Sequence, residues 1–343
     1  MSAYAVVGPE RHGVVIHALR LAAATPALGS RLVRVCATDP GRVADDLRRA
    51  LVGHETAMIQ VTDHLLGESP AEAADLVEDL ARSTALVLCL HDLPQPGEGE
   101  ARHARRRTAY RRFAASAAVV VVASEHERTL LARCLDEGSG DTPVVVLPLS
   151  LERAGETTTT EQRAPRGAPE VGVLGFLYPG KGLEDVIDAT ARVASHGRDV
   201  AVVNVGGVSP GHEPLVNELS ARAGRLGTRF TLGGYVPERD LTAVLRAVAV
   251  PVAAHRHVSA SGSINTWISL GRRPIVRAGA YTRELAERMP GVVTLVDDAA
   301  GLASAIEGAL ACPDTTWIDD DVQLGPTWAD SALAHEAVLR SIS

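Results

Sequence analysis

Short apolar runs alternate with helical segments along most of the chain. Residues 5–7, 57–61 and 85–90 are apolar runs of strand length, whereas residues 14–24 and 70–82 repeat their apolar side chains at helical spacing. Strands that alternate with helices pack as a parallel sheet covered on both faces. The sequence therefore predicts an α/β protein built on doubly wound parallel sheets.

The alternation stops once and then starts again. Residues 153–169 contain four consecutive threonines, two prolines and no apolar periodicity, which is typical of a linker. Beyond them, a strand at 171–174 precedes a helix at 183–196, and the alternation continues to a strand at 274–277. At about 100 to 200 residues per domain, 343 residues also fit two domains. We predict domains at 1–152 and 170–325, the linker at 153–169, and a terminal helical segment at 326–343.

Composition and charge exclude several classes of protein. The net charge of −8 leaves no general basic surface for nucleic acid or an anionic membrane. The four cysteines stand far apart without a CxxC pair, so neither a zinc knuckle nor a disulfide framework is indicated, and we expect no metal. No run approaches the about 18 apolar residues of a membrane span, and no signal peptide is recognisable. We therefore expect a cytoplasmic protein without a transmembrane segment.

A glycine-rich segment follows the predicted strand at 171–174. Residues Gly175 to Gly182 read GFLYPGKG, which has the G-x4-G-K spacing of a phosphate-binding P-loop. Gly182, however, stands where that motif has the serine or threonine that holds magnesium, and the later strands end without an acid. Lys181 and Gly180 are candidate phosphate ligands. A P-loop NTPase and a plain glycine-rich turn with an exposed lysine are the alternatives.

A second candidate is the stretch between Asp240 and Glu284, which contains no carboxylate in 43 residues. It holds two histidines and six arginines, at positions 246, 256, 272, 273, 277 and 283. Within it, Ser261, Gly262 and Ser263 lead into a predicted helix, whose N-terminal amides and dipole favour a phosphate. With Lys181, this segment suggests a diphosphate site. The alternative is a packed helix with an N-cap serine and solvated arginines.

A cleft is expected between the two domains, because open parallel sheets bind ligands beyond the carboxyl ends of their strands. In the first domain, His91 follows the strand at 85–90, and His12 with Gly13 lies in the loop after the first strand. Both histidines are predicted to face this cleft, where an imidazole donates a hydrogen bond or transfers a proton. As surface loop residues they would do neither.

Long segments of the chain resemble the GT-B glycosyltransferases of retaining family 4. The resemblance is carried by VGVLGFLYPGKGLEDVIDATARV, by FTLGGYVPERDLTAVLRAVAVPVAAHRHVSASGSINTWISLGRRPIV and by the terminal helix at Trp328. It is weaker in the first domain, at GPERHGV, at LHD and at VVVASEHE. The resemblance implies two Rossmann-like domains facing across a cleft. It also implies that the last helix crosses back onto the first domain.

The resemblance further implies a nucleoside diphosphate sugar as donor and neither a metal nor another cofactor. Lys181 would contact the phosphates, Tyr235 and Val236 would lie near the base, and His91 would touch the transferred sugar. The acceptor would be a small molecule, a glycan or a lipid. Nucleic acid is not an expected partner.

Three positions depart from the family pattern. Phe176 stands where the family has an arginine, and the family's two glutamates, eight positions apart, would fall on Val258 and Thr266. Asn265 or Thr266 is left to bind the ribose, and Arg256 to replace the missing arginine.

The sequence thus predicts a glycosyltransferase that acts with retention of anomeric configuration. Lys181, arginine and a helix dipole would neutralise the departing diphosphate without a metal. A non-catalytic nucleotide-sugar binder, or a partner of another transferase, is the first alternative, and a P-loop NTPase is the second.

Overall fold

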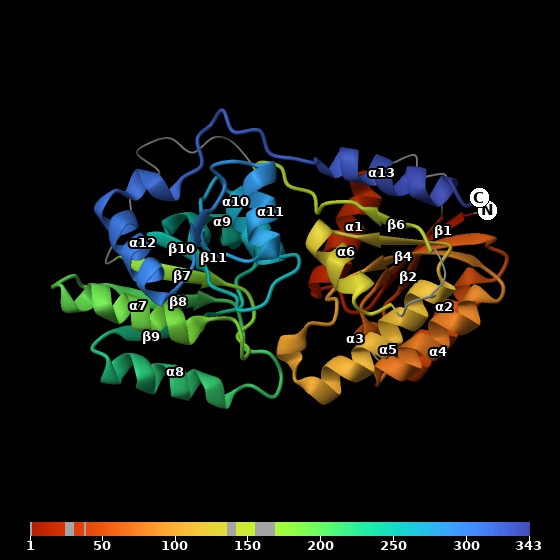
Figure 1. Ribbon diagram of the computed structural model, residues 1–343, viewed down its shortest axis with the longest axis horizontal. Helices are drawn as coiled ribbons and strands as arrows, with labels where there is room; N and C mark the ends of the chain where they lie inside the picture. Colours follow the sequence, from red (N-terminus) through yellow and green to blue (C-terminus); the bar gives the residue numbers. More distant parts are fainter. Residues whose placement is uncertain (1, 25–30, 38, 136–141, 155–168) are drawn as a thin grey trace. The chain divides into compact units, whose positions relative to one another are not determined.

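The computed structural model describes residues 2–24, 31–37, 39–135, 142–154 and 169–343. The chain forms two compact units, one of Met1–Ser150 with Gly325–Ser343 and the other of Leu151–Leu324 (Figure 1). Each unit contains a six-stranded sheet whose neighbouring strands all pair in parallel. The predicted α/β fold with two doubly wound sheets is confirmed.

Most of the expected linker, residues 155–168, lies outside the described residues. The residues just before it already belong to the second unit. The Ala154 amide donates to the Ser269 carbonyl at 2.7 Å, and Arg153 donates to the Asp319 carbonyl at 2.6 Å. Leu151 is fully buried in a core cluster of the second unit.

The strands of the first sheet stand in the order β2-β1-β3-β4-β5-β6. They are β1 (Ser2–Val7), β2 (Arg31–Val35), β3 (Thr56–Val61), β4 (Ala85–Leu90), β5 (Val119–Val122) and β6 (Val144–Val146). The helices are α1 (Gly13–Ala24), α2 (Pro40–Leu51), α3 (Asp63–Leu66), α4 (Pro70–Ala81), α5 (Glu100–Ser116), α6 (Glu125–Ala132) and α13 (Trp328–Arg340), with a short 3-10 helix at Pro96–Glu98.

Side chains of β1 enter two different cores. Ala3 and Ala5 pack in the cluster that includes α2, α4, α5 and α6, whereas Tyr4 and Val6 pack with α1 and α13. Successive strand residues point to opposite faces, so both faces of the sheet are covered. Leu339 of α13 is buried in the second of these clusters. The last helix therefore completes the cover of the face that carries α1.

The strands of the second sheet stand in the order β12-β11-β10-β7-β8-β9. They are β7 (Glu170–Leu174), β8 (Ala201–Val205), β9 (Arg229–Gly234), β10 (Val250–Ala253), β11 (Ile275–Arg277) and β12 (Thr294–Val296). The helices are α7 (Leu183–Ser195), α8 (Pro214–Arg225), α9 (Glu238–Ala247), α10 (Gly262–Ser269), α11 (Ala280–Arg288) and α12 (Ala299–Ala311), with a 3-10 helix at Pro313–Thr316. Helices α7, α8 and α12 cover one face, and α9, α10 and α11 cover the other.

Each sheet has a point where the direction of winding reverses. In the first sheet, β1 lies between β2 and β3, and in the second, β7 lies between β8 and β10. The loops that leave neighbouring strands there run to helices on opposite faces. Such a switch point opens a crevice at the carboxyl edge of a parallel sheet, where ligands bind. A ligand site is therefore expected at the two switch points.

Candidate functional site

The loops that follow β7 and β10 meet at the switch point of the second sheet. The Arg256 amide donates to the Gly180 carbonyl at 3.1 Å. Gly182 has a φ of +84°, and a Cβ built there would lie 1.9 Å from the Ala254 carbonyl oxygen. Only glycine permits this backbone conformation together with so close an approach. The two loops are thus held against each other by backbone contacts.

Lys181 lies between these two glycines and is buried, with 4% of its surface exposed. Its Nζ is 3.0 Å from Nε2 of His255, which is also buried. Among the described residues, no carboxylate forms an ion pair with this ammonium. A Cβ built on Gly175, whose φ is +110°, would lie 3.0 Å from Nζ. The glycine therefore leaves room beside the charged group.

Burial strongly lowers the pKa of both Lys181 and His255. It lowers the pKa of Lys181 to about 8. Burial and then the charge of Lys181 lower the pKa of His255 to about 3, against a rise from the Ala253 backbone. The imidazole is therefore neutral and accepts a hydrogen bond from the ammonium, while its buried Nδ1 makes no well-aligned hydrogen bond in the described structure and has only the Ala253 backbone interaction. A buried cation is costly unless it is paired with an opposite charge, so Lys181 provides the electrostatic conditions for binding an anion.

Helix α7 begins two residues after Lys181, and α10 begins seven residues after His255 in the chain. Gly182, the N-cap residue of α7, makes no side-chain cap hydrogen bond. In α10, the Ser261 hydroxyl accepts from the Ile264 amide at 3.2 Å, and the Ser261 and Ser263 hydroxyls are 3.1 Å apart. Gly262 is exposed, and a Cβ there would meet no atom within 4 Å. Both helix N-termini offer amides and a positive dipole end to an anion.

The predicted nucleoside residues have different surroundings. Asn265 is buried and accepts at Oδ1 from the Tyr281 hydroxyl at 3.4 Å, and Thr266 donates to the Gly262 carbonyl at 2.7 Å. Tyr235 is 62% exposed and Val236 is half-buried. The exposed aromatic side chains of the described residues all lie in loops at this edge, after β7 and β9. They are Phe176, Tyr178 and Tyr235.

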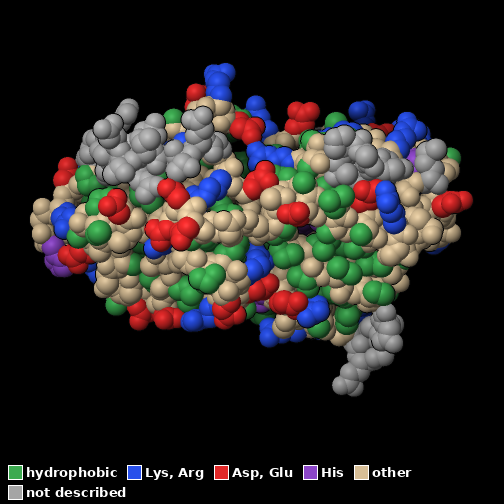
Figure 2. All heavy atoms as spheres, turned by 90° about the horizontal axis from the view of Figure 1, so that it is seen from above, with side chains coloured by type: hydrophobic (Ala, Val, Ile, Leu, Met, Phe, Trp, Pro, Cys, Tyr) green, Lys and Arg blue, Asp and Glu red, His purple; other side chains and the backbone are tan. Residues whose placement is uncertain are grey.

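The six arginines of the carboxylate-free stretch do not form one basic patch. Arg272 is 1% exposed and donates to the Val248 and Ala249 carbonyls. Four others face acids from other segments: Arg256 and Arg277 pair with Asp185, Arg273 with Asp319, and Arg283 with Asp297. Acidic and basic side chains are also interspersed over the face seen in Figure 2. The role of Arg256 as a phosphate ligand stays a prediction.

At the switch point of the first sheet, two histidines meet. Nε2 of His12, after β1, is 3.0 Å from Nε2 of His64, after β3. Burial and then His64 lower the pKa of His12. Gly13 is the first residue of α1. Sequence analysis missed His64, although its place after an apolar run, as for His91, could have identified it.

His91 follows β4, and its ring is held by a chain of buried polar groups. Its Nε2 is 2.6 Å from Oε1 of Gln60, whose Nε2 donates to the Tyr4 hydroxyl at 3.1 Å. With the amide in this orientation, Gln60 Oε1 only accepts, so Nε2 of His91 carries the proton and Nδ1 has a free lone pair. Burial lowers the pKa of His91 to about 4. The residue is therefore a neutral imidazole of defined tautomer.

A buried arginine fixes the loop that carries His91. Arg106 donates to Asp63 at 3.0 Å and also to the Asp92 carbonyl. The Tyr110 hydroxyl donates to the His91 carbonyl at 2.6 Å. Asp92 has a φ of +50°, which is uncommon for a residue other than glycine. These contacts hold the backbone on both sides of the imidazole.

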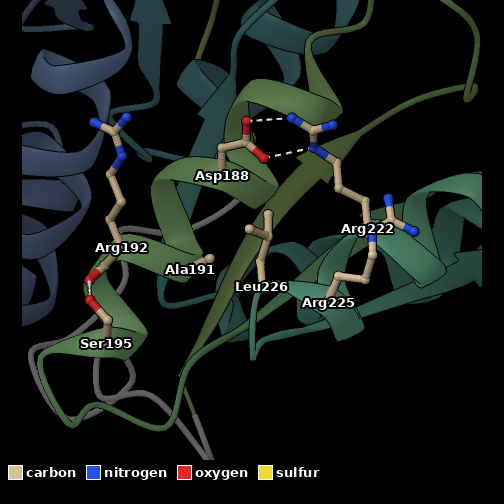
Figure 3. Close-up of a pocket in the computed structure, with 7 residues that line it drawn as sticks. All are labelled: Asp188, Ala191, Arg192, Ser195, Arg222, Arg225 and Leu226. Atoms are coloured by element: carbon tan, nitrogen blue, oxygen red, sulfur yellow. Dashed lines mark hydrogen bonds and ion pairs between the residues drawn. The ribbon is translucent and has the colours of Figure 1, made fainter.

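A surface pocket of about 430 Å³ lies elsewhere on the second unit, between α7 and α8 (Figure 3). It is lined by Asp188, Ala191, Arg192, Ser195, Arg222, Arg225 and Leu226. Its arginines stand in the last turns of the two helices, where cations complement the dipole, and Arg222 pairs with Asp188. Because helices end at the amino edge of a parallel sheet, this pocket is remote from the switch point.

The described residues contain no cluster of at least three His, Cys, Asp or Glu side chains that could hold a metal ion. None of the described helices combines the length and the apolar character that crossing a membrane requires.

The structure is similar to several solved structures, whereas no family model and no curated protein matches the sequence. HepE of Anabaena, in complex with UDP and glucose, is 16% identical over 99% of this chain and 96% of its own, with a TM-score of 0.70. Sucrose-phosphate synthase of Thermosynechococcus elongatus is also 16% identical over 99% of this chain and 96% of its own, with a TM-score of 0.70. A UDP-forming α,α-trehalose-phosphate synthase of Burkholderia vietnamiensis is 14% identical over 90% of this chain and 78% of its own, with a TM-score of 0.60. At such identities the likeness establishes the fold, the GT-B type with two Rossmann-like domains.

Proposed function

We propose that this protein is a glycosyltransferase that moves a sugar from a nucleoside diphosphate sugar to an acceptor. The observation that carries the proposal is the buried ammonium of Lys181, which pairs with no carboxylate in the part of the chain that the structure describes and lies at the switch point of the second sheet. A diphosphate would supply the missing negative charge. HepE, which is similar in fold, has been solved with UDP-glucose.

The site suits the chemistry of a departing diphosphate. Negative charge grows on the leaving group as the glycosidic bond breaks, and fixed dipoles and cations stabilise it most where water is excluded. Lys181 and the N-termini of α7 and α10 supply these groups without a metal. Tyr235, exposed after β9, offers a ring on which a base can stack. We propose that the reaction retains the anomeric configuration.

For His91 we propose contact with the transferred sugar. Because its Nε2 is bound to Gln60, the ring presents Nδ1 as an acceptor for a sugar hydroxyl. A neutral acceptor of this kind orients the sugar without adding charge. His12 and Gly13 stay proposed neighbours of the acceptor, whose class we propose to be a small molecule, a glycan or a lipid. The proposed place of action is the cytoplasm.

A nucleotide-sugar binder without activity is the second candidate. It is favoured by the absence of carboxylates at Val258 and Thr266, where the resembling family has glutamates. The P-loop NTPase is disfavoured by the loop itself. A serine or threonine at Gly182 would bring its Cβ within 1.9 Å of the Ala254 carbonyl oxygen. The hydroxyl that holds magnesium in a P-loop therefore has no place here.

The test is donor binding and turnover with UDP-, GDP- and ADP-sugars, with and without Lys181→Ala. We expect the wild-type protein to bind one donor and to release its nucleoside diphosphate in the presence of EDTA. Lys181→Ala should weaken that binding about tenfold to a hundredfold, the scale of a charge-assisted hydrogen bond. Binding without turnover over an acceptor panel would favour the non-catalytic binder. Unchanged affinity in Lys181→Ala would contradict the assigned phosphate site.

A further inference from the structure

His255 contacts Lys181, and no role of its own was predicted for it. We propose that His255 is a second ligand of the donor diphosphate and that it takes up one proton when the nucleotide sugar binds. This inference rests on the proposed function, because it concerns the same phosphate site.

The geometry places the imidazole where an anion must meet it. Nε2 of His255 lies 3.0 Å from Nζ of Lys181, so a phosphate that contacts the ammonium also lies beside the ring. His255 is 7% exposed, and its buried Nδ1 makes no well-aligned hydrogen bond in the described structure, although the Ala253 backbone interacts with the ring and raises its pKa. A buried polar atom without a partner is unfavourable in a folded protein. His255 therefore has hydrogen-bonding capacity that the unliganded fold does not use.

The charged side chains near Lys181 and His255 favour His255 as the second ligand of the diphosphate. The acids in the first turn of α7 are Glu184 and Asp185, and Arg256 contacts both, at 4.0 and 3.2 Å. Arg277 pairs with Asp185 as well, at 3.0 Å. The sequence suggested that Arg256 replaces the family's phosphate arginine, yet its guanidinium already has two acidic neighbours. For His255, the residue before it, no acidic partner occurs among the described residues, and its ring contacts Lys181.

The proton balance follows from these surroundings. Without ligand, Lys181 is the charged member, and the pKa of His255 is about 3. A diphosphate brings two negative charges beside the ring, and opposite charge favours the protonated imidazole. One proton then passes from solvent to His255, and the hydrogen bond between the two side chains is replaced by N–H donation from each to phosphate oxygens. No other bond is made or broken.

Calorimetric titration at pH 7 in buffers of different ionisation enthalpy measures this proton directly. The probe is the nucleotide sugar that binds among UDP-glucose, GDP-mannose and ADP-glucose, whose diphosphates carry no titrating proton near neutral pH. Lys181, with a pKa of about 8, is already about nine-tenths charged at pH 7, so it contributes little uptake. We expect uptake of about one proton, and an association constant that falls about tenfold per pH unit as the pH rises.

His255→Asn keeps a hydrogen-bonding amide but cannot be protonated. We expect it to bind about tenfold more weakly at pH 7 and to lose most of the proton uptake. The matched control is His257→Asn in the same loop, where the histidine is exposed, and it should behave as the wild type. The pH dependence of wild-type binding tests the inference even where His255→Asn does not fold.

The outcomes separate the inference from the proposed function. A wild-type protein that binds no nucleotide sugar would contradict the proposed function. A wild-type protein that binds without proton uptake, or a folded His255→Asn that keeps the uptake, would overturn the role of His255 and leave the proposed function standing.

Discussion

The glycines on either side of Lys181 differ in how much they restrict the site. Both have positive φ, +92° at Gly180 and +84° at Gly182. A Cβ on Gly180 would meet nothing within 4 Å, whereas one on Gly182 would meet the Ala254 carbonyl. Conformational strain is therefore common to both positions, and steric conflict is confined to the second.

Alanine at each position separates these two effects. Gly180→Ala should lower the free energy of unfolding by about 1 to 2 kcal/mol, the cost of the left-handed conformation. Gly182→Ala adds overpacking against the Ala254 carbonyl, so we expect a loss of about 2 to 5 kcal/mol. Urea unfolding of the two variants provides the comparison. Equal losses would show that the loops after β7 and β10 separate easily.

Gln60 offers a second test at the residue scale, through its effect on His91. In Gln60→Leu, Nε2 of His91 loses its acceptor, so the fixed tautomer should give way to a mixture. Gln60→Glu places a carboxylate beside the ring and should raise the pKa of His91 above its present value of about 4. Nitrogen chemical shifts of the labelled imidazole report both changes.

The same variants also address turnover. If His91 orients the sugar, Gln60→Leu should lower kcat about tenfold or more while donor affinity changes little. A variant with altered imidazole shifts and normal kcat would remove His91 from the proposed reaction, whereas unaltered shifts would contradict the role of Gln60.

At the element scale, the alternation of apolar runs predicted the sheets better than it predicted the site. The expected helix at 183–196 is α7, and the strand at 274–277 is β11, each within one residue. Helix α11, strand β12 and helix α12 were not predicted. The strand has only three residues, at 294–296, which give too little pattern to recognise.

The site depends on topology, which the local pattern does not contain. Lys181 was found because glycines flank it, whereas His255 was noted only as one of two histidines in an arginine-rich stretch. The two are 74 positions apart and meet because β7 and β10 are neighbours in the sheet. Gln60 was missed for the same reason. A polar residue inside an apolar strand is recognisable, but its partner on the next strand is not.

Helices α1 and α13 pack together around buried histidines, and this packing predicts a pH dependence of stability. Burial lowers the pKa of His17 on α1 and of His335 on α13. His91, His335 and Arg20 lower the pKa of His17 further. Asp92 opposes the downward shift of His91, and His335 and His12 add to it, whereas the Ser331 backbone opposes the shift of His335. All three imidazoles are neutral in the folded protein near neutral pH.

The unfolded chain binds these protons with an ordinary pKa of about 6.5, so it gains protons over the folded protein as the pH falls below that value. Stability should therefore be full above pH 6.5 and decrease toward pH 4, by up to about 1.4 kcal/mol per pH unit for each histidine. His335→Gln should reduce this slope. Urea unfolding between pH 4 and 7 measures the slopes of the wild type and the variant, and parallel curves for the two proteins would contradict the assignment.

At the scale of the whole molecule, the chain builds the first unit from two separate segments. It leaves that unit at Ser150, forms the whole second unit and returns at Gly325. Leu339 of α13 is buried with Val15 and Ala18 of α1 on one face of the first sheet. The second unit has its own core clusters and contains every group of the proposed phosphate site. Removal of the last segment should therefore affect the two units very differently.

A chain that ends at Leu324 tests this division. It exposes the side chains that α13 covers, and each large apolar side chain returned to water costs about 1.5 to 3 kcal/mol, so the first unit should melt several degrees lower or not fold.

The second unit loses no part of its core. We expect it to melt as in the full chain and to bind donor within about threefold of the full-length affinity. If binding is retained, a donor at about 100 times its Kd still adds about 2.7 kcal/mol to the stability of that unit. Calorimetric scans with and without nucleotide sugar resolve the two transitions. Loss of donor binding in a shortened chain whose second transition persists would show that the phosphate site needs the first unit.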